Sequence, residues 1–116
     1  MTTRDQRTHH RINSLNLLNY VQFDEDDNAV RQGMGRTLNV SESGILLETH
    51  VALDLNAMVL LTIGLEEDLV DVRGEVLHSK PGEEEKYEAG IRFIEPDETA
   101  QQILQIYVKM FKEMEE

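Results

Sequence analysis

The sequence predicts an all-β domain, a six-stranded antiparallel β-barrel with a C-terminal α-helix. From residue 17 to residue 94, short apolar or alternating runs are separated by glycine, proline, asparagine or acidic clusters, as strands are separated by turns. From residue 99 onward the apolar period changes to the three-and-four spacing of an amphipathic helix. Short strands in series favour a closed or nearly closed barrel, and the helix is then expected to cover an open end or side.

The sequence predicts a single domain, 1–116, which consists of three successive parts. The first part, 1–15, has no apolar periodicity and is expected to be a flexible N-terminal arm. The barrel is expected over 16–95 and the helical part over 96–116. The expected strands are 17–23, 34–38, 44–49, 58–63, 69–78 and 87–94.

Three of these elements carry further expectations. The run 58–63 is apolar enough to predict burial on both faces. Gly74 predicts a bulge or bend in the fifth strand. Thr99 and Gln102 have the spacing of a capping box at the start of a helix over 99–114. The apolar stripe of that helix is expected to consist of Ile103, Ile106, Tyr107, Met110, Phe111 and Met114.

Composition restricts the classes of function. A chain of 116 residues with 40% hydrophobic residues can bury one core, and the absence of cysteine excludes disulfides and thiolate metal sites. No run approaches the ~20 apolar residues of a membrane span, and the polar start does not resemble a secretory signal, so a cytoplasmic protein is expected. The net charge of −12 argues against binding DNA, RNA or anionic membranes.

Positive charge is nevertheless concentrated near the N-terminus. Five of the eleven basic residues are arginines at positions 4, 7, 11, 31 and 36. Guanidinium groups bind phosphate through two hydrogen bonds and read guanine at O6 and N7. A small anionic ligand can therefore be held locally, whereas a long polyanion would be repelled by the rest of the surface.

A polar turn separates the second and third expected strands. It has the sequence Asn-Val-Ser-Glu-Ser-Gly over 39–44, which provides an amide, hydroxyl groups and a glycine that can adopt positive φ. Upstream, Arg7 and Arg11 are spaced four apart. Together, Arg-x-x-x-Arg and Asn-x-Ser-x-x-Gly resemble the signature of PilZ domains, bacterial receptors for cyclic di-GMP. The segment Tyr87–Phe93 is similar to the closing strand of that family.

The resemblance implies a ligand site. Arg7 and Arg11 would grip the phosphates and guanine of cyclic di-GMP, while Asn39, Ser41 and Gly44 would line the guanine pocket. Many PilZ sequences carry aspartate where Asn39 stands, and the amide lacks the ionic acceptor for guanine N1 and N2. Secondary ligand contacts are expected from the remaining nearby cations, namely Arg4, His10 and Arg36.

The resemblance also implies a cyclic di-GMP receptor that regulates a downstream protein partner through a change in arm conformation. Its output would be motility, biofilm formation or similar bacterial signalling. The alternative is a PilZ-like protein-interaction adaptor that does not bind nucleotide. A third possibility, a barrel that binds single-stranded nucleic acid, is disfavoured by the negative charge and the few aromatic residues. The oligomeric state is left open.

Neither catalysis nor metal binding is expected. No Ser/His/Asp triad, phosphate loop or paired acid stands out. His9 and His10 lack a third metal ligand at a recognisable spacing. The acidic run 24–28 lacks the glycine and terminal glutamate of a calcium loop, so a solvated loop is expected.

Overall fold

The computed structural model describes residues 17–65 and 67–114. In this part of the chain, six strands precede one helix, as expected. The elements are β1 (Leu17–Phe23), β2 (Ala29–Val40), β3 (Gly44–Thr49), β4 (Met58–Leu65), β5 (Asp68–Pro81), β6 (Tyr87–Phe93) and α2 (Glu98–Met114). β2 is longer than predicted and begins at Ala29. The predicted arm, with Arg4, Arg7, His10 and Arg11, lies outside the described residues.

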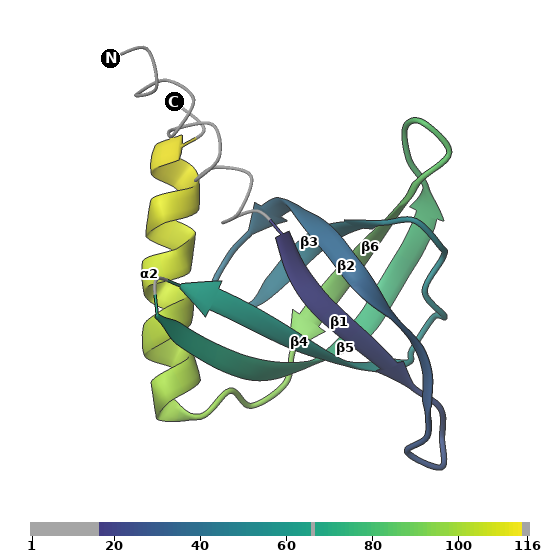
Figure 1. The fold of residues 1–116 in the computed structure, drawn as a ribbon, viewed down its shortest axis with the longest axis horizontal. Coiled ribbons are helices and arrows are strands. Elements are labelled where there is room, and N and C mark those ends of the chain that lie inside the picture. The colour runs from purple at the N-terminus through teal and green to yellow at the C-terminus, as the bar shows by residue number, and fades with distance from the viewer. Residues whose placement is uncertain (1–16, 66, 115–116) are drawn as a thin grey trace.

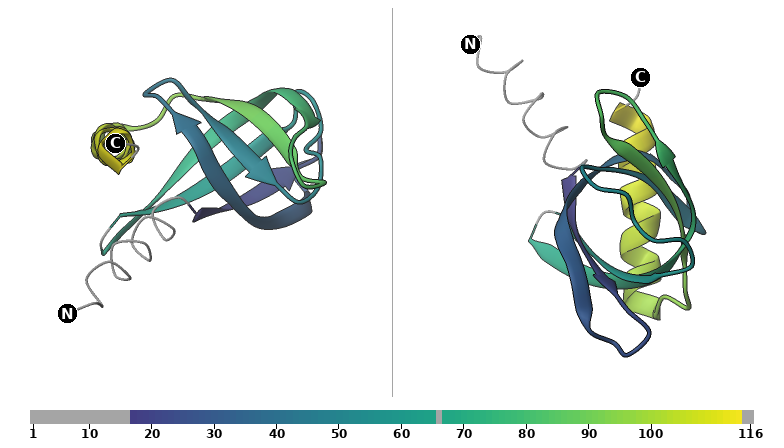
Figure 2. Two further views of the ribbon diagram at one scale, coloured as in Figure 1. Left: turned by 90° about the horizontal axis from the view of Figure 1, so that it is seen from above. Right: turned by 90° about the vertical axis from the view of Figure 1, so that its right-hand side faces the viewer.

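The strands form a closed antiparallel barrel in the order β1-β2-β3-β6-β5-β4 (Figure 1). Closure comes from β1, which pairs with β2 on one side and with β4 on the other, where Asn19 lies opposite Thr62. Viewed along the barrel, α2 spans one open end (Figure 2, right). This arrangement confirms the predicted barrel with a C-terminal helix.

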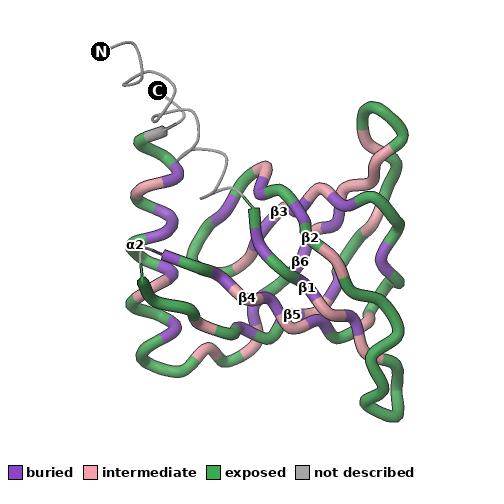
Figure 3. The backbone as a smooth tube through the Cα atoms, viewed as in Figure 1, coloured by how far each residue is buried: buried purple, intermediate pink, exposed green. Residues whose placement is uncertain are grey.

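Alternation along the strands forms the core. Inward side chains such as Tyr20, Leu47 and Leu61 are almost completely buried, while their neighbours face outward (Figure 3). The predicted two-sided burial of β4 is wrong, because its residues alternate between buried and more exposed positions. None of the described elements covers its outer face, since the helix lies at the end of the barrel.

The buried face of the helix agrees only in part with the predicted stripe. Tyr107 and Phe111 are buried as predicted, and Ile103 and Met110 are half-buried. The buried side chains of the helix are Ala100, Leu104, Tyr107, Val108 and Phe111, whereas Ile106 is 47% exposed. Apolar residues occupy a broad arc of this helix, so periodicity alone could not choose the face that packs on the barrel.

The predicted capping box is also wrong. The helix begins at Glu98, and the residue before it, Asp97, is the N-cap. The Asp97 carboxylate accepts a hydrogen bond from the Ala100 backbone N–H at 2.8 Å, and its carbonyl accepts one from Gln101 at 2.8 Å. Aspartate at this position satisfies an N–H group of the first turn, so Thr99 lies inside the helix rather than at its cap.

One buried hydrogen bond links the helix to β2. The hydroxyl groups of Tyr107 and Thr37 lie 2.7 Å apart, and both side chains are buried. Burial raises the pKa of the Tyr107 phenol, and its bond to Thr37 opposes that rise. Thr37 lies two residues before Asn39, so the helix is attached directly to the strand that leads into the polar turn.

Candidate ligand-binding site

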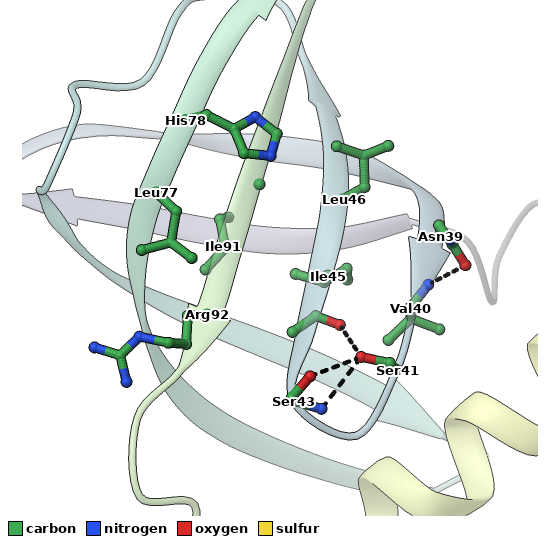
Figure 4. A pocket seen from close by; sticks show the side chains of 12 residues that line it. Asn39, Val40, Ser41, Ser43, Ile45, Leu46, Leu77, His78, Ile91 and Arg92 are labelled. Atoms are coloured by element: carbon green, nitrogen blue, oxygen red, sulfur yellow. Dashed lines mark hydrogen bonds between the residues drawn. The ribbon is translucent and has the colours of Figure 1, made fainter.

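A hollow of about 370 Å³ lies between the β2–β3 turn and the strands β5 and β6 (Figure 4). Three of the predicted site residues, Asn39, Ser41 and Gly44, line it. The turn forms one wall, and side chains from β5 and β6 form the opposite wall. The sequence motif therefore lies along the edge of an open hollow.

Ser41 organises the turn. Its backbone N–H donates to the Gly44 carbonyl at 2.8 Å. Its hydroxyl oxygen accepts the Ser43 backbone N–H at 3.2 Å and lies 3.1 Å from the Ser43 hydroxyl (Figure 4). Serine is suited to such turns because its side chain replaces a missing backbone partner. The turn is thus shaped before any ligand arrives.

Asn39 follows a β-bulge. The register of β2 against β3 shifts between Thr37 and Asn39, which makes Leu38 the additional residue. The Asn39 side-chain oxygen accepts the Val40 backbone N–H at 2.9 Å. This bond fixes the amide, and its nitrogen has no partner within the described residues. That nitrogen is a donor available to a ligand.

Gly44 is needed for packing rather than for its backbone conformation. None of the glycines in the described residues has positive φ, so Gly44 does not use the conformational freedom that glycine has in turns. A Cβ atom at this position would lie 2.5 Å from the Ile91 carbonyl oxygen of β6. Only glycine lets β3 approach β6 this closely at the turn, and this approach forms the base of the hollow.

The opposite wall contains residues that the sequence did not indicate. The register of β5 against β6 shifts between Val76 and His78, so Leu77 and His78 are consecutive exposed residues. Both line the hollow, together with Arg92 from β6. Figure 4 shows these three side chains across from the turn. The predicted bulge at Gly74 is therefore misplaced by three residues.

Gly74 has a packing role of its own. A Cβ atom there would collide with the Ile91 side chain. Arg92, beside Ile91, donates to the Glu75 carboxylate at 2.6 Å, and its side chain is 54% exposed. One carboxylate thus holds the guanidinium at the edge of the hollow, and much of its surface remains accessible to solvent.

A comparison with protein-family models identifies the relationship. The model described as PilZ domain matches residues 5–109, a range that includes both arginines and the polar turn. The chain belongs to the PilZ domain family. A search of the curated proteins gave no match. PilZ domains are binding and effector modules, and the barrel with its helix has the fold of that family.

Arg36 lies apart from the hollow of the PilZ domain. Its guanidinium donates to the two carboxylate oxygens of Glu48 at 3.0 and 3.4 Å. The hydrogen bond from Arg36 lowers the pKa of Glu48, and the same bond raises the pKa of Arg36. The hollow is lined by Arg92 rather than by Arg36.

Two further features concern only the part of the chain that the structure describes, residues 17–65 and 67–114. No group of three or more His, Cys, Asp or Glu residues in it is arranged to hold a metal ion. No helix in it is long and apolar enough to cross a membrane.

Proposed function

We propose that this PilZ domain is a receptor for cyclic di-GMP that regulates a downstream protein partner. The observation that carries the proposal is that Asn39, Ser41 and Gly44 line one hollow whose opposite wall contains Arg92. The family match supports the same ligand, because its range includes both arginines of the arm. The proposal includes a cytoplasmic location and assigns no catalysis and no cofactor.

The hollow provides complementary chemistry for a guanine nucleotide. The Asn39 amide nitrogen has no partner among the described residues, and Ser41 holds the turn in shape. Leu77, which is 49% exposed, offers an apolar surface for a base. Arg92 provides a guanidinium group on the opposite wall, and this side chain is 54% exposed although its charge is partly compensated by Glu75. On a protein of net charge −12, an anionic ligand requires such local cations.

Arg7 and Arg11 complete the proposed site. We assign to them the grip on the phosphates and guanine, because guanidinium groups bind phosphate and the guanine O6/N7 edge through paired hydrogen bonds. Ligand contacts with both the arm and the turn then favour a closed arrangement of the arm. The ligand shifts that equilibrium only by its differential affinity for the closed state.

Isothermal titration with cyclic di-GMP tests the assignment. Arg7→Ala and Arg11→Ala are each expected to weaken binding roughly ten- to a hundredfold, because each removes a charged hydrogen-bond donor. Arg73→Ala is the matched control, since Arg73 is exposed on β5 and does not line the hollow. If the wild type binds and neither arm variant weakens binding, the arginine assignment is wrong.

Titration with cyclic di-AMP tests how the base is recognised. Adenine presents an amino donor where guanine presents O6, so an arginine donor would face another donor. We therefore expect much weaker binding of the adenine dinucleotide. Equal affinity for both dinucleotides would show that the site recognises phosphate and shape rather than guanine.

A protein-interaction adaptor that binds no nucleotide is the second candidate. It is favoured by the internal roles of two motif residues, because Ser41 holds the turn and Gly44 allows β3 to approach β6. A titration without heat or saturation for the wild-type protein would select this alternative.

A further inference from the structure

A second and larger hollow lies at the other end of β2 from the polar turn. It has a volume of about 760 Å³ and lies between the loop after β1 and the loop before β4. Its size is within the range of about 300–1,000 Å³ that is usual for ligand pockets. We call it the hairpin-end groove; its lining includes Phe23, Val30, Leu55, Ala57 and Met58.

The groove has an unusually exposed apolar lining. Leu55 is 60% exposed, Val30 is 49% exposed and Met58 is 37% exposed. A smaller hollow of about 270 Å³ shares Phe23 and Met58 with it and is also lined by Leu60, Asp27 and Arg73. Adjacent exposed apolar side chains in a concave surface are typical of sites that bind another molecule.

The groove is held in shape by bonds within the domain. The side chain of Gln22 is buried, and it donates to the Asp54 carboxylate at 2.8 Å while accepting the Asp54 backbone N–H at 3.2 Å. Asn56, two residues after Asp54 in the same loop, donates its backbone N–H to the Val76 carbonyl oxygen at 2.8 Å. A partner would therefore bind to a surface whose shape is already fixed, which lowers the entropic cost of binding.

The rim of the groove is acidic. Its carboxylates belong to Asp24, Glu25, Asp26 and Asp54, and Arg31 is the one cation among the described residues that line it. Arg31 lies 3.4 Å from Asp54, so its charge is partly compensated. Backbone hydrogen bonding, chiefly from Asn28, lowers the pKa of Asp24.

We propose that the hairpin-end groove docks a short basic segment of a partner protein, with apolar side chains in the groove and lysine or arginine at the rim. The acidic rim would repel nucleic acid and anionic lipid. A second copy of this chain would bring another net charge of −12 to the same rim. Opposite charge beside exposed apolar side chains matches a basic, partly apolar peptide best.

The groove is then the surface that binds the downstream partner of the function proposed above. This assignment rests on that proposed function only in requiring that a partner protein exists. The tests below omit nucleotide and use no residue of the other hollow. A failure here leaves the titration with cyclic di-GMP unaffected, and a failure of that titration leaves the groove proposal intact.

Fluorescence anisotropy with labelled synthetic peptides provides the test. The probe is a short peptide of alternating leucine and lysine, compared with a serine–lysine peptide and a leucine–glutamate peptide of equal length. At physiological salt, we expect the leucine–lysine peptide to bind at least about tenfold more tightly than either control, because both apolar anchors and rim charges contribute. Equal binding of the serine–lysine peptide would overturn the proposal.

A pair of leucine variants separates groove binding from general attraction to an acidic protein. Leu55→Asp adds a negative charge inside the groove, and Leu69→Asp adds the same charge at a 77% exposed leucine at the other end of the β4–β5 pair. Only Leu55→Asp is expected to weaken binding of the leucine–lysine peptide, by about tenfold. If both variants strengthen binding equally, the attraction is nonspecific and the groove is not the site.

A pair of charge variants locates the electrostatic contribution. Glu25→Gln with Asp26→Asn neutralises two rim carboxylates, and Glu83→Gln with Glu84→Gln neutralises two at the β5–β6 tip. The rim variant is expected to bind several-fold more weakly, and the tip variant to match the wild type. Equal losses would contradict docking at the rim. Sedimentation showing a dimer that Leu55→Asp abolishes would instead identify a second copy as the occupant and overturn the proposal.

Discussion

Two hairpins of the barrel reverse the chain with different backbone conformations. At the β2–β3 turn, no residue from Ser41 to Gly44 has positive φ, and serine side-chain bonds hold the chain. At the β5–β6 tip, Lys86 donates its N–H to the Glu83 carbonyl at 3.0 Å across Glu84 and Glu85, whose φ angles are 56° and 64°. Two consecutive left-handed residues are the pattern of a type I′ turn, which favours Asn-Gly.

In the described part of this protein, the left-handed backbone conformation occurs only at residues other than glycine. Positive φ falls on acidic or amide side chains, and none of the described glycines has it. At the candidate site, Gly44 is required for packing, so the turn is held without backbone strain. At the other tip, the strain is borne by glutamates that make the surface acidic. The candidate site is therefore preorganised, whereas the β5–β6 tip is not optimised for stability.

Gly44→Ala is expected to produce the largest effect. The new methyl group would meet the Ile91 carbonyl oxygen at 2.5 Å, and backbone cannot move away as a flexible side chain can. The free energy of unfolding, measured with urea, should fall by about 1–3 kcal/mol. Gly82→Ala is the control, because its Cβ atom would meet the movable Glu88 side chain at 3.0 Å. Equal losses in both variants would show that the contact with β6 is not the reason for glycine at 44.

Replacing Glu84 by Asn and Glu85 by Gly should have the opposite sign. The double variant places the preferred residues in a turn whose left-handed conformation costs most L residues about 1–2 kcal/mol each. Part of that gain is offset by the greater freedom of glycine in the unfolded chain. We expect a net stabilisation of about 1 kcal/mol, seen as a higher Tm, with unchanged affinity for cyclic di-GMP. A lower Tm would contradict the view that this tip is strained.

The barrel was predictable because the sequence pattern that indicates a strand is local and recurs in each strand. Alternation identified the strands, and the change of period identified the helix. The same signal identified Tyr107 and Phe111 on the buried helix face but not Leu104, because Ile106 and Leu104 are equally apolar and only contact with the barrel distinguishes them. The register between strands was likewise not predictable, since the bulges at Leu38 and Leu77 leave only a local break in alternation.

Only one wall of the candidate hollow could be predicted from the sequence. The turn residues Asn39, Ser41 and Gly44 form a contiguous motif, so a short pattern was enough to find them. Leu77, His78 and Arg92 come from two distant strands and meet the turn only through barrel closure. The available signal was the alternation that ends after Val76, where a bulge exposes two consecutive residues.

Ser41→Ala tests how much the side-chain bonds contribute to the unstrained turn. Its hydroxyl accepts the Ser43 N–H at 3.2 Å and donates to the Gly44 carbonyl oxygen at 3.4 Å, and loss of these exposed bonds should lower the free energy of unfolding by about 0.5–1 kcal/mol. Ser43→Ala is the control, because its hydroxyl contacts only the Ser41 hydroxyl among the described residues. Chemical denaturation of both variants measures the difference. An equal loss would show that the Ser41 bonds to the backbone have no special role.

Glu48 forms ion pairs with a residue of each hairpin. Its carboxylate on β3 receives hydrogen bonds from Arg36 on β2 and lies 3.9 Å from the Lys86 ammonium beside the β5–β6 tip. The Glu48 side chain is only 11% exposed, while that of Arg36 is 51% exposed. The bond from Arg36 is the main reason that the pKa of Glu48 lies below its ordinary value of 4.5.

Glu48→Gln should therefore have the smallest effect and a defined pH dependence. A carboxyl group whose pKa is lower in the folded state stabilises the fold above its ordinary value, and this contribution is lost as pH falls through the lowered pKa. The free energies of unfolding of wild type and variant should differ by at most about 1 kcal/mol above pH 4.5 and converge below it. Arg36→Leu in the same series should remove most of the convergence, because Arg36 is the main cause of the shift. A difference that stays constant through the acid range would show that Glu48 acts through packing rather than through its charge.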